Sequence, residues 1–159
     1  MPKIKQSFKT GFSFGLTSGI ITTLGLMVGL QSGTNSKTIV ASGILIIALA
    51  DALSDAFGIH ISEESDKNQG RREVWESTIS TFISKLVFAL SFLVPILFFS
   101  LSFAVIIGIL WGIFLIGSFS FYIAKQQERS PVKVISEHIF ITIAVVIITY
   151  FIGGLFRNP

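Results

Sequence analysis

Two aspartates, Asp51 and Asp55, lie one helical turn apart inside the apolar run 38–61. A carboxylate near the centre of a bilayer costs about 2.5–3.5 kcal/mol on insertion scales, and it normally faces a bundle interior or a wet pathway. Two acids at positions i and i+4 of a helix also share one face. They repel each other there unless a cation, a proton or a basic side chain lies between them. The pair therefore predicts a site that handles ions.

Lys85 is the third charge inside an apolar run. At about 1.5 Å of rise per residue, it is expected at a depth similar to that of Asp55, whereas Asp51 is expected to lie deeper. One interpretation is an ion pair between Lys85 and Asp55. Another is a Lys85 side chain that snorkels to the membrane interface. Neither interpretation accounts for Asp51, so the deeper acid carries the ion-site hypothesis.

The elements that must position these charges are apolar helices. Of the 159 residues, 51% are hydrophobic and 13% are charged, and the mean hydropathy of +0.77 is unlike that of an ordinary soluble domain. A bilayer span takes about 20 apolar residues, and the sequence has five such runs: 12–30, 38–61, 79–99, 101–124 and 134–156. We expect an all-α polytopic membrane protein, one domain with five transmembrane helices, the third kinked at Pro95.

Basic residues indicate the orientation in the membrane. Nine of the twelve Lys and Arg residues flank the side that holds the amino terminus: Lys3, Lys5, Lys9, Lys67, Arg71, Arg72, Lys125, Arg129 and Lys133. Only Lys37 and Arg157 flank the opposite side. The positive-inside rule then predicts a cytoplasmic amino terminus and an external carboxyl terminus, which we place in a prokaryotic cell membrane. The first run lacks a small-residue cleavage pattern, so we expect a span there and no signal peptide.

The first apolar run carries two glycine ladders with a spacing of four residues: Gly11, Gly15 and Gly19, then Gly25, Gly29 and Gly33. Small residues at this spacing make a flat helix face that another backbone can approach closely. The neighbouring backbone belongs either to the same chain or to a second protomer. The sequence favours neither partner.

The segment 62–77 is the only long charged stretch, and its carboxylates include Glu63, Glu64 and Asp66. Hard oxygen ligands of this kind suit a mouth that gathers divalent cations, with His60 as a further candidate ligand. Basic residues are mixed into the same segment, which favours a solvated cytoplasmic loop. We expect a short charged cytoplasmic loop, with the cation mouth as the weaker interpretation.

Three segments together resemble the vacuolar iron transporter family of divalent-metal exporters. The stretch from Phe14 to Gly29 (FGLTSGIITTLGLMVG) is similar to the family's N-D-G-L-x-T-T-x-G-L-x-x-G signature, and Ala50–Ser62 (ADALSDAFGIHIS) is similar to A-x-A-[LI]-S-M-x-x-G-E-Y-x-S. The third segment, Ile148–Phe156 (ITYFIGGLF), resembles the I-T-Y-x-I-G ending. The resemblance implies a homodimer whose ion pathway runs between the protomers and is built chiefly from the first two spans.

Departures from the family pattern fall at the positions that would carry the chemistry. Ser18 stands where the family has Asp, Ile59 stands where it has Glu, and Asp55 stands where it has Met. Asp51 is an additional carboxylate. Because carboxylate and hydroxyl ligands without a thioether suit a hard cation, Mn²⁺ or Mg²⁺ fits this ligand set at least as well as Fe²⁺.

The leading hypothesis is a dimeric exporter of a divalent cation, iron or manganese or another, which moves it out of the cytosol in exchange for protons. Asp51 and Asp55 would line the pathway, with Ser18, Thr22 and Ser54 as neutral oxygen ligands or supports, and glycines of the ladders (Gly11, Gly15, Gly19, Gly25 and Gly29) would pack the dimer. Two alternatives remain: a membrane interaction protein that does not transport, and a carrier of another small solute whose acids relay protons. The chain has no cysteine, nucleophile–base pair or phosphate-binding loop, so we expect no enzyme, no cofactor and no nucleic-acid partner.

Overall fold

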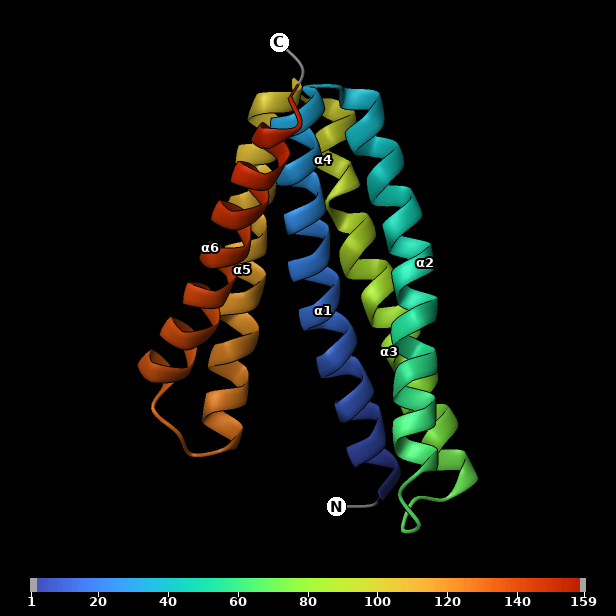
Figure 1. The fold of residues 1–159 in the computed structure, drawn as a ribbon. Coiled ribbons are helices and arrows are strands. Elements are labelled where there is room, and N and C mark those ends of the chain that lie inside the picture. The colour runs from blue at the N-terminus through green and yellow to red at the C-terminus, as the bar shows by residue number, and fades with distance from the viewer. Residues whose placement is uncertain (1–2, 158–159) are drawn as a thin grey trace.

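The structure is a computed structural model that describes residues 3–157, with side chains described from Gln6 onward. The chain is helical: α1 (Lys3–Thr34), α2 (Lys37–Glu64), α3 (Arg71–Ser91), α4 (Leu93–Phe98), α5 (Leu101–Gln126) and α6 (Pro131–Leu155) (Figure 1). Within the described residues, five helical segments are long and apolar enough to cross a membrane, with α3 and α4 together forming one of them. This confirms the prediction of an all-helical chain with five potential spans.

The amino terminus, the α2–α3 loop and the α5–α6 loop lie at one end of the bundle, and the carboxyl terminus lies at the other (Figure 1). The basic residues follow these ends: Lys9, Lys67, Arg71, Arg72, Lys125, Arg129 and Lys133 belong to the first end, and Lys37 and Arg157 to the second. Lys3 and Lys5, which the topology prediction also used, lie outside the described side chains. The charge asymmetry is therefore an asymmetry between two ends of one bundle.

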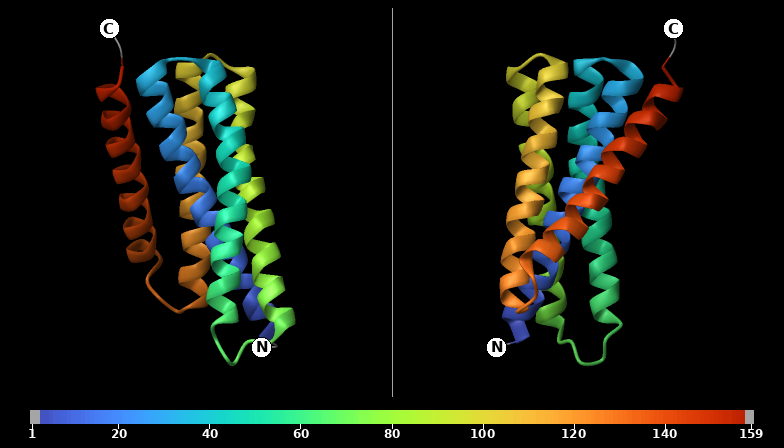
Figure 2. Two further views of the ribbon diagram at one scale, coloured as in Figure 1. Left: turned by 45° about the vertical axis from the view of Figure 1, so that its right-hand side comes forward. Right: turned by 90° about the vertical axis from the view of Figure 1, so that its left-hand side faces the viewer.

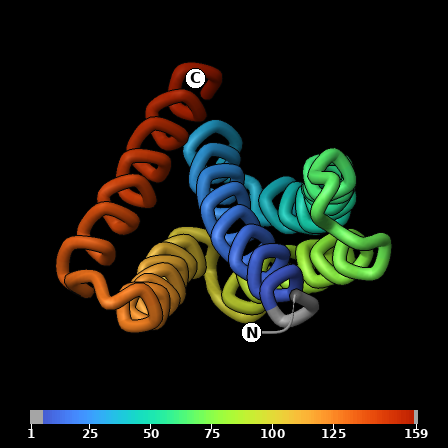
Figure 3. The backbone as a smooth tube through the Cα atoms, turned by 90° about the horizontal axis from the view of Figure 1, so that it is seen from below, coloured from blue at the N-terminus to red at the C-terminus, as the bar shows by residue number. Residues whose placement is uncertain are grey.

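α1 runs through the middle of the molecule, with α2 and α3 on one side and α5 and α6 on the other (Figure 3). It packs against α2, α3, α5 and α6, and its Ile20, Leu24 and Met27 side chains have no exposed surface. α6 crosses this arrangement obliquely at the periphery (Figure 2), and only its Val134 and Thr142 are buried. Large apolar side chains cover the outer surface, which suits contact with lipid.

The third predicted span is broken at Phe92, where α3 ends and α4 begins. Pro95 explains the break because it has no N–H to donate to the carbonyl of Ser91, one turn earlier. α4 then ends at Phe98. Lys37 of α2 binds this end, because its Nζ donates to the carbonyl oxygens of Leu97 (3.2 Å) and Phe99 (3.0 Å). The expected kink is thus a short interruption whose far end is held by α2.

The helices extend beyond the apolar runs that predicted them. α2 continues to Glu64 and α3 begins at Arg71, so the charged segment 62–77 is loop only between them. Polar residues at the ends of membrane helices stay helical because intrahelical hydrogen bonds still satisfy their backbones. The apolar runs therefore mark the middle of each helix and leave out its charged ends.

Candidate functional site

Small residues bring α2 close to its neighbours at the level of the two acids. The buried stripe of α2 consists of Val40, Ile44, Ala48, Ala52 and Ala56, and its alanines allow close approach of another helix. Asp51 and Asp55 directly precede Ala52 and Ala56, so both carboxylates lie at the edge of this stripe. Their side chains are 23% and 20% exposed, respectively.

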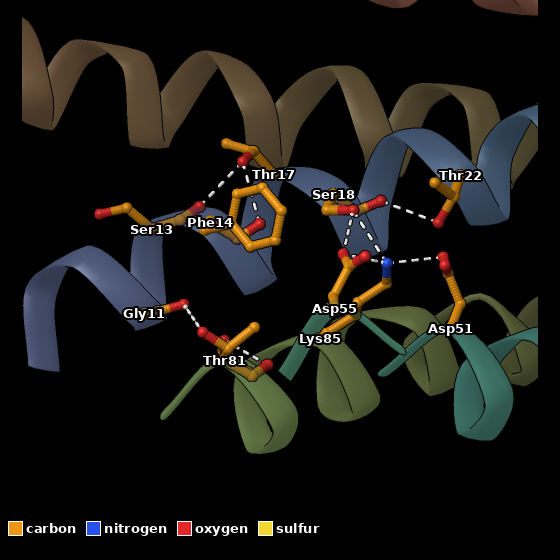
Figure 4. Close-up of polar contacts among 11 residues, drawn as sticks. Gly11, Ser13, Phe14, Thr17, Ser18, Thr22, Asp51, Asp55, Thr81 and Lys85 are labelled. Atoms are coloured by element: carbon orange, nitrogen blue, oxygen red, sulfur yellow. Dashed lines mark hydrogen bonds and ion pairs between the residues drawn. The ribbon is translucent and has the colours of Figure 1, made fainter. Parts of the chain in front are cut away.

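The Lys85 side chain lies between the two acids (Figure 4). Its Nζ forms ion pairs with Oδ2 of Asp51, at 2.6 Å, and with Oδ2 of Asp55. It also donates to Ser18 Oγ at 2.9 Å, and that hydroxyl donates in turn to Asp55 Oδ2 at 2.7 Å. Asp51, Asp55 and Lys85 are called the triad below, and they join α2 to α3 beside α1.

The first glycine ladder of α1 explains how Lys85 reaches the acids. A Cβ at Gly19 would lie 2.9 Å from the carbonyl oxygen of Lys85 and 3.2 Å from its Cα, so only glycine lets the α3 backbone approach this closely. Further down, Thr81 Oγ1 donates to the carbonyl of Gly11 at 3.1 Å, and Ser80 Oγ donates to that of Phe8 at 3.2 Å. α3 is thereby held against α1, and Lys85 is enclosed with an exposure of 1%.

The charges of the triad do not balance. One ammonium lies between two carboxylates, so the triad carries a net charge of −1 when all three groups are ionised. Removing one partner of a buried ion pair costs about 3–5 kcal/mol, so Lys85 is needed to hold two acids at this depth. The remaining negative charge is available to a proton or to another cation.

The other predicted ligands do not meet at the triad. Thr22 Oγ1 donates to the carbonyl of Ser18 at 2.8 Å, inside α1. Ser54 is exposed on the outer face of α2. Of the three hydroxyl residues proposed as neutral ligands, the structure therefore brings only Ser18 into contact with the acids.

The predicted cation mouth is also dispersed. Asp66 Oδ1 accepts hydrogen bonds from the backbone N–H of Asn68 at 2.9 Å and from its side-chain amide at 3.1 Å. Asp66 thus stabilises a turn, as Asp residues often do. His60 faces α3, where its Nδ1 lies 3.0 Å from Thr78 Oγ1. Its ring packs edge-on against the Trp75 ring, with 4.8 Å between the ring centroids. Glu63 and Glu64 are the last two residues of α2. Residues 6–157 contain no group of three or more His, Cys, Asp or Glu side chains placed to hold a metal ion.

The structure packs both glycine ladders inside the protomer. Gly11, Gly15 and Gly19 face α3, whereas Cβ atoms at Gly25 and Gly29 would lie 3.0 Å from Val145 Cγ1 and 3.3 Å from the Thr149 carbonyl of α6. This is the same-chain alternative for the ladders. The homodimer stays a prediction. The first ladder is covered by α3, whereas Gly25 and Gly29 contact α6 and also line a groove between α1, α2 and α6.

Sequence reasoning missed the contact between Lys85 and Asp51. A signal was present in α3, where Ser77, Thr81 and Lys85 recur every four residues and so share one helix face. Ser77 and Thr81 are both buried on that face. A stripe of small hydroxyl residues predicts the face that packs against a glycine ladder, and Lys85 continues it.

Comparisons with known proteins add no relative: no protein-family model, no curated protein and no solved structure matches this chain. The similarity to vacuolar iron transporters therefore rests on the three sequence motifs, and the family assignment stays a prediction.

Proposed function

We propose that this chain is a membrane transporter that exchanges a divalent cation for protons at the triad. The observation that carries the proposal is the uncompensated carboxylate: Lys85 contacts both Asp51 and Asp55 but neutralises only one of them. A net negative charge among apolar helices binds whatever positive charge can reach it. Protons and metal ions then compete for the same oxygens, which couples their movements.

The proposed transporter is a dimer of two copies of the chain. Two triads, each with a net charge of −1, would together carry −2, which matches one divalent cation or two protons. The exposed sides of Asp51 and Asp55 continue the α2 stripe that contains Ile47, and Ile47 lines a groove of about 720 Å³ between α1, α2 and α6. Neither acid lines that groove, but both continue the same α2 face, where contact with lipid would leave the two carboxylates poorly solvated. We therefore propose that a second protomer covers the groove and this face.

The Lys85 ammonium would compete with the transported cation for the carboxylates of Asp51 and Asp55. Its ammonium occupies the space between the two carboxylates, so an arriving cation must displace it or bind on the exposed side of the acids. The bond from Ser18 to Asp55 would keep one acid in place during that exchange. Oxygen ligands favour a hard cation such as Mn²⁺, Mg²⁺ or Fe²⁺, and the proposed direction is from the cytosol outward.

One observation favours a second candidate function. Lys85 is almost completely enclosed and contacts both acids and Ser18, which is the arrangement of a structural brace. In that case the chain would be a membrane interaction protein without transport, or a carrier of another solute in which the acids relay only protons. These candidates differ from the first in what crosses the membrane.

The decisive experiment is uptake into proteoliposomes across a panel of Fe²⁺, Mn²⁺, Mg²⁺ and Zn²⁺, with a pH-sensitive dye inside. Asp51→Asn makes the triad neutral, so we expect a stable protein without cation flux and without the linked pH change. Asp66→Asn, in the α2–α3 loop, is the matched control and should keep full flux. Normal cation flux in Asp51→Asn would reject the pathway role, and proton movement without any cation flux would favour the proton relay.

Orientation and association are tested with single cysteines, because the chain has none of its own. Positions 67 and 38 lie at opposite ends of the bundle. We expect Lys67→Cys to be labelled only from the cytoplasmic side, and Thr38→Cys serves as the comparison from the other end. Ile47→Cys, in the groove, should form a disulfide-linked dimer. Absence of that dimer, or labelling of both ends from one side, would contradict the proposed assembly or topology.

A further inference from the structure

A second cavity lies at the amino-terminal end of the bundle, on a different face from the triad. It has a volume of about 710 Å³, is open on one side, and is lined by residues of α1 and α5 and by Glu76 of α3. Its charged lining residues are Lys9 of α1 and Glu76 of α3, and its aromatic walls include Phe12, Phe119 and Tyr122. The function proposed above uses none of these residues.

One carboxylate oxygen of Glu76 accepts no hydrogen bond from the described residues. Its Oε2 atom is buried, and it has no hydrogen-bond partner within the part of the chain that the structure describes. A buried carboxylate oxygen without a donor is costly, so this oxygen favours a ligand that brings a positively charged N–H group. The aromatic rings beside it also attract cations through their faces.

A positively charged side chain, that of Lys9, lines the same cavity. Lys9 Nζ donates to Gln126 Oε1 at 3.4 Å, and Gln126 Nε2 donates to the Tyr122 hydroxyl at 2.5 Å. An ammonium and side-chain amides thus line the same cavity as the Glu76 carboxylate. The pair Lys9 and Glu76 has no net charge, which is complementary to a ligand that carries one phosphate and one ammonium.

An apolar groove of about 530 Å³ continues from this cavity and shares Phe8, Phe12 and Glu76 with it. It follows α3 past Ile79 and Ile83 to Val87. The distance from Glu76 to Val87 is about 16 Å at 1.5 Å per residue, which matches one leaflet of a hydrocarbon core about 30 Å thick. The groove thus has the length and the surface for an acyl chain.

We propose that the cavity and its groove bind one aminophospholipid from the adjacent leaflet. Glu76 accepts hydrogen bonds from the headgroup ammonium, Lys9 faces the phosphate, and an acyl chain lies along Ile79, Ile83 and Val87. The ligand would join α1, α3 and α5 at the end where α1 and α5 diverge (Figure 1). This site is separate from the triad and requires only that the helices lie in a bilayer.

The test is native mass spectrometry of the purified full chain, incubated with phosphatidylethanolamine, phosphatidylcholine or phosphatidylglycerol. We expect one retained phosphatidylethanolamine per chain, at least tenfold preferred over phosphatidylglycerol. Glu76→Gln should remove this preference, whereas Glu137→Gln, an exposed acid of α6, should preserve it. Ile83→Trp, which fills the groove, should lower retention of phosphatidylethanolamine, and Ile143→Trp on α6 should not.

Three results would overturn the proposal. Equal retention of the three lipids by the unmodified chain would remove the headgroup recognition, and this measurement needs no variant to fold. Protection of the chain from heat by free ethanolamine as strong as that by phosphatidylethanolamine would assign the cavity to a soluble amine. Loss of dimers in Ile83→Trp, with lipid retention unchanged, would make this face a contact between copies.

Discussion

The two halves of α1 have the same glycine spacing but neighbours of different chemistry. Gly11, Gly15 and Gly19 face α3, whose contact face carries hydroxyls and then Lys85; Gly25 and Gly29 face α6, which brings no charge to the contact. The first half therefore positions an ionic site, whereas the second half holds a peripheral helix and lines an apolar groove. The difference teaches that a glycine ladder determines how closely a neighbour approaches, while the neighbour's side chains determine what the contact does.

The largest effect should come from removing the charge that distinguishes the first half. Lys85→Met leaves two carboxylates without their cation, and breaking a buried pair in this way costs about 3–5 kcal/mol. Thermal unfolding in detergent measures the loss. Lys125→Met, whose ammonium lies over the Phe121 ring at the exposed end of α5, is the control and should change stability little.

Charge balance, rather than the lysine itself, should decide that result. Asp51→Asn and Asp55→Asn each leave one acid paired with Lys85, so each single variant should be as stable as the unmodified chain or more stable. The double variant Asp51→Asn/Asp55→Asn leaves Lys85 unpaired and should again lose about 3–5 kcal/mol. Equal stability of the single and double variants would contradict a triad held together by charge.

The next effect compares glycines of the two halves directly. A Cβ at Gly15 would collide with the backbone of Thr81 and approach Lys85 N to 3.1 Å. The atoms nearest to a Cβ at Gly25 would be side-chain methyl groups of Val145 and Thr149, at 3.0 and 3.2 Å. Backbone atoms cannot move aside as methyl groups can. Gly15→Ala should therefore cost about 3 kcal/mol and Gly25→Ala about 1 kcal/mol, measured as shifts in the unfolding midpoint. Equal costs would show that the two halves pack alike.

The smallest effect compares one hydroxyl from each half. Ser18 contacts two charged groups, and hydrogen bonds of this kind contribute about 1.5–3 kcal/mol. Ser32 Oγ donates to the neutral carbonyl of Tyr150 at 2.8 Å, a bond worth about 1 kcal/mol. Ser18→Ala should therefore destabilise the chain more than Ser32→Ala, and only Ser18→Ala should slow cation flux. The reverse order of stability would contradict the ionic role of Ser18.

The sequence was sufficient to predict the helices because apolar runs of membrane length are an unambiguous pattern. It was insufficient for the contacts of those helices. The spacing from Gly11 to Gly33 predicts close approach of a backbone, but glycine has no side chain that selects a particular neighbour. α3 and α6 were therefore not predictable as the partners of α1 from α1 alone.

The candidate site was predictable in its acids and less so in its connections. Asp51 and Asp55 stand out because carboxylates are rare in membrane helices. Depth along each helix suggested that Lys85 could pair with Asp55 but left Asp51 unexplained, because a count of helical rise ignores the reach of a lysine side chain. Thr22 and Ser54 looked like ligands by position, yet Thr22 bonds its own helix and Ser54 lies on the outer surface.

The central position of α1 has a consequence for biosynthesis. α1 is made before α6, and its Gly29 and Gly33 pack against Thr149 and Gly153 of α6, which leave the ribosome on the order of ten seconds later at ordinary rates of synthesis. During that interval the second ladder lacks the helix that it packs against. α1 therefore completes its packing only after α6 has been made, and a chain truncated before α6 would present an uncovered glycine face.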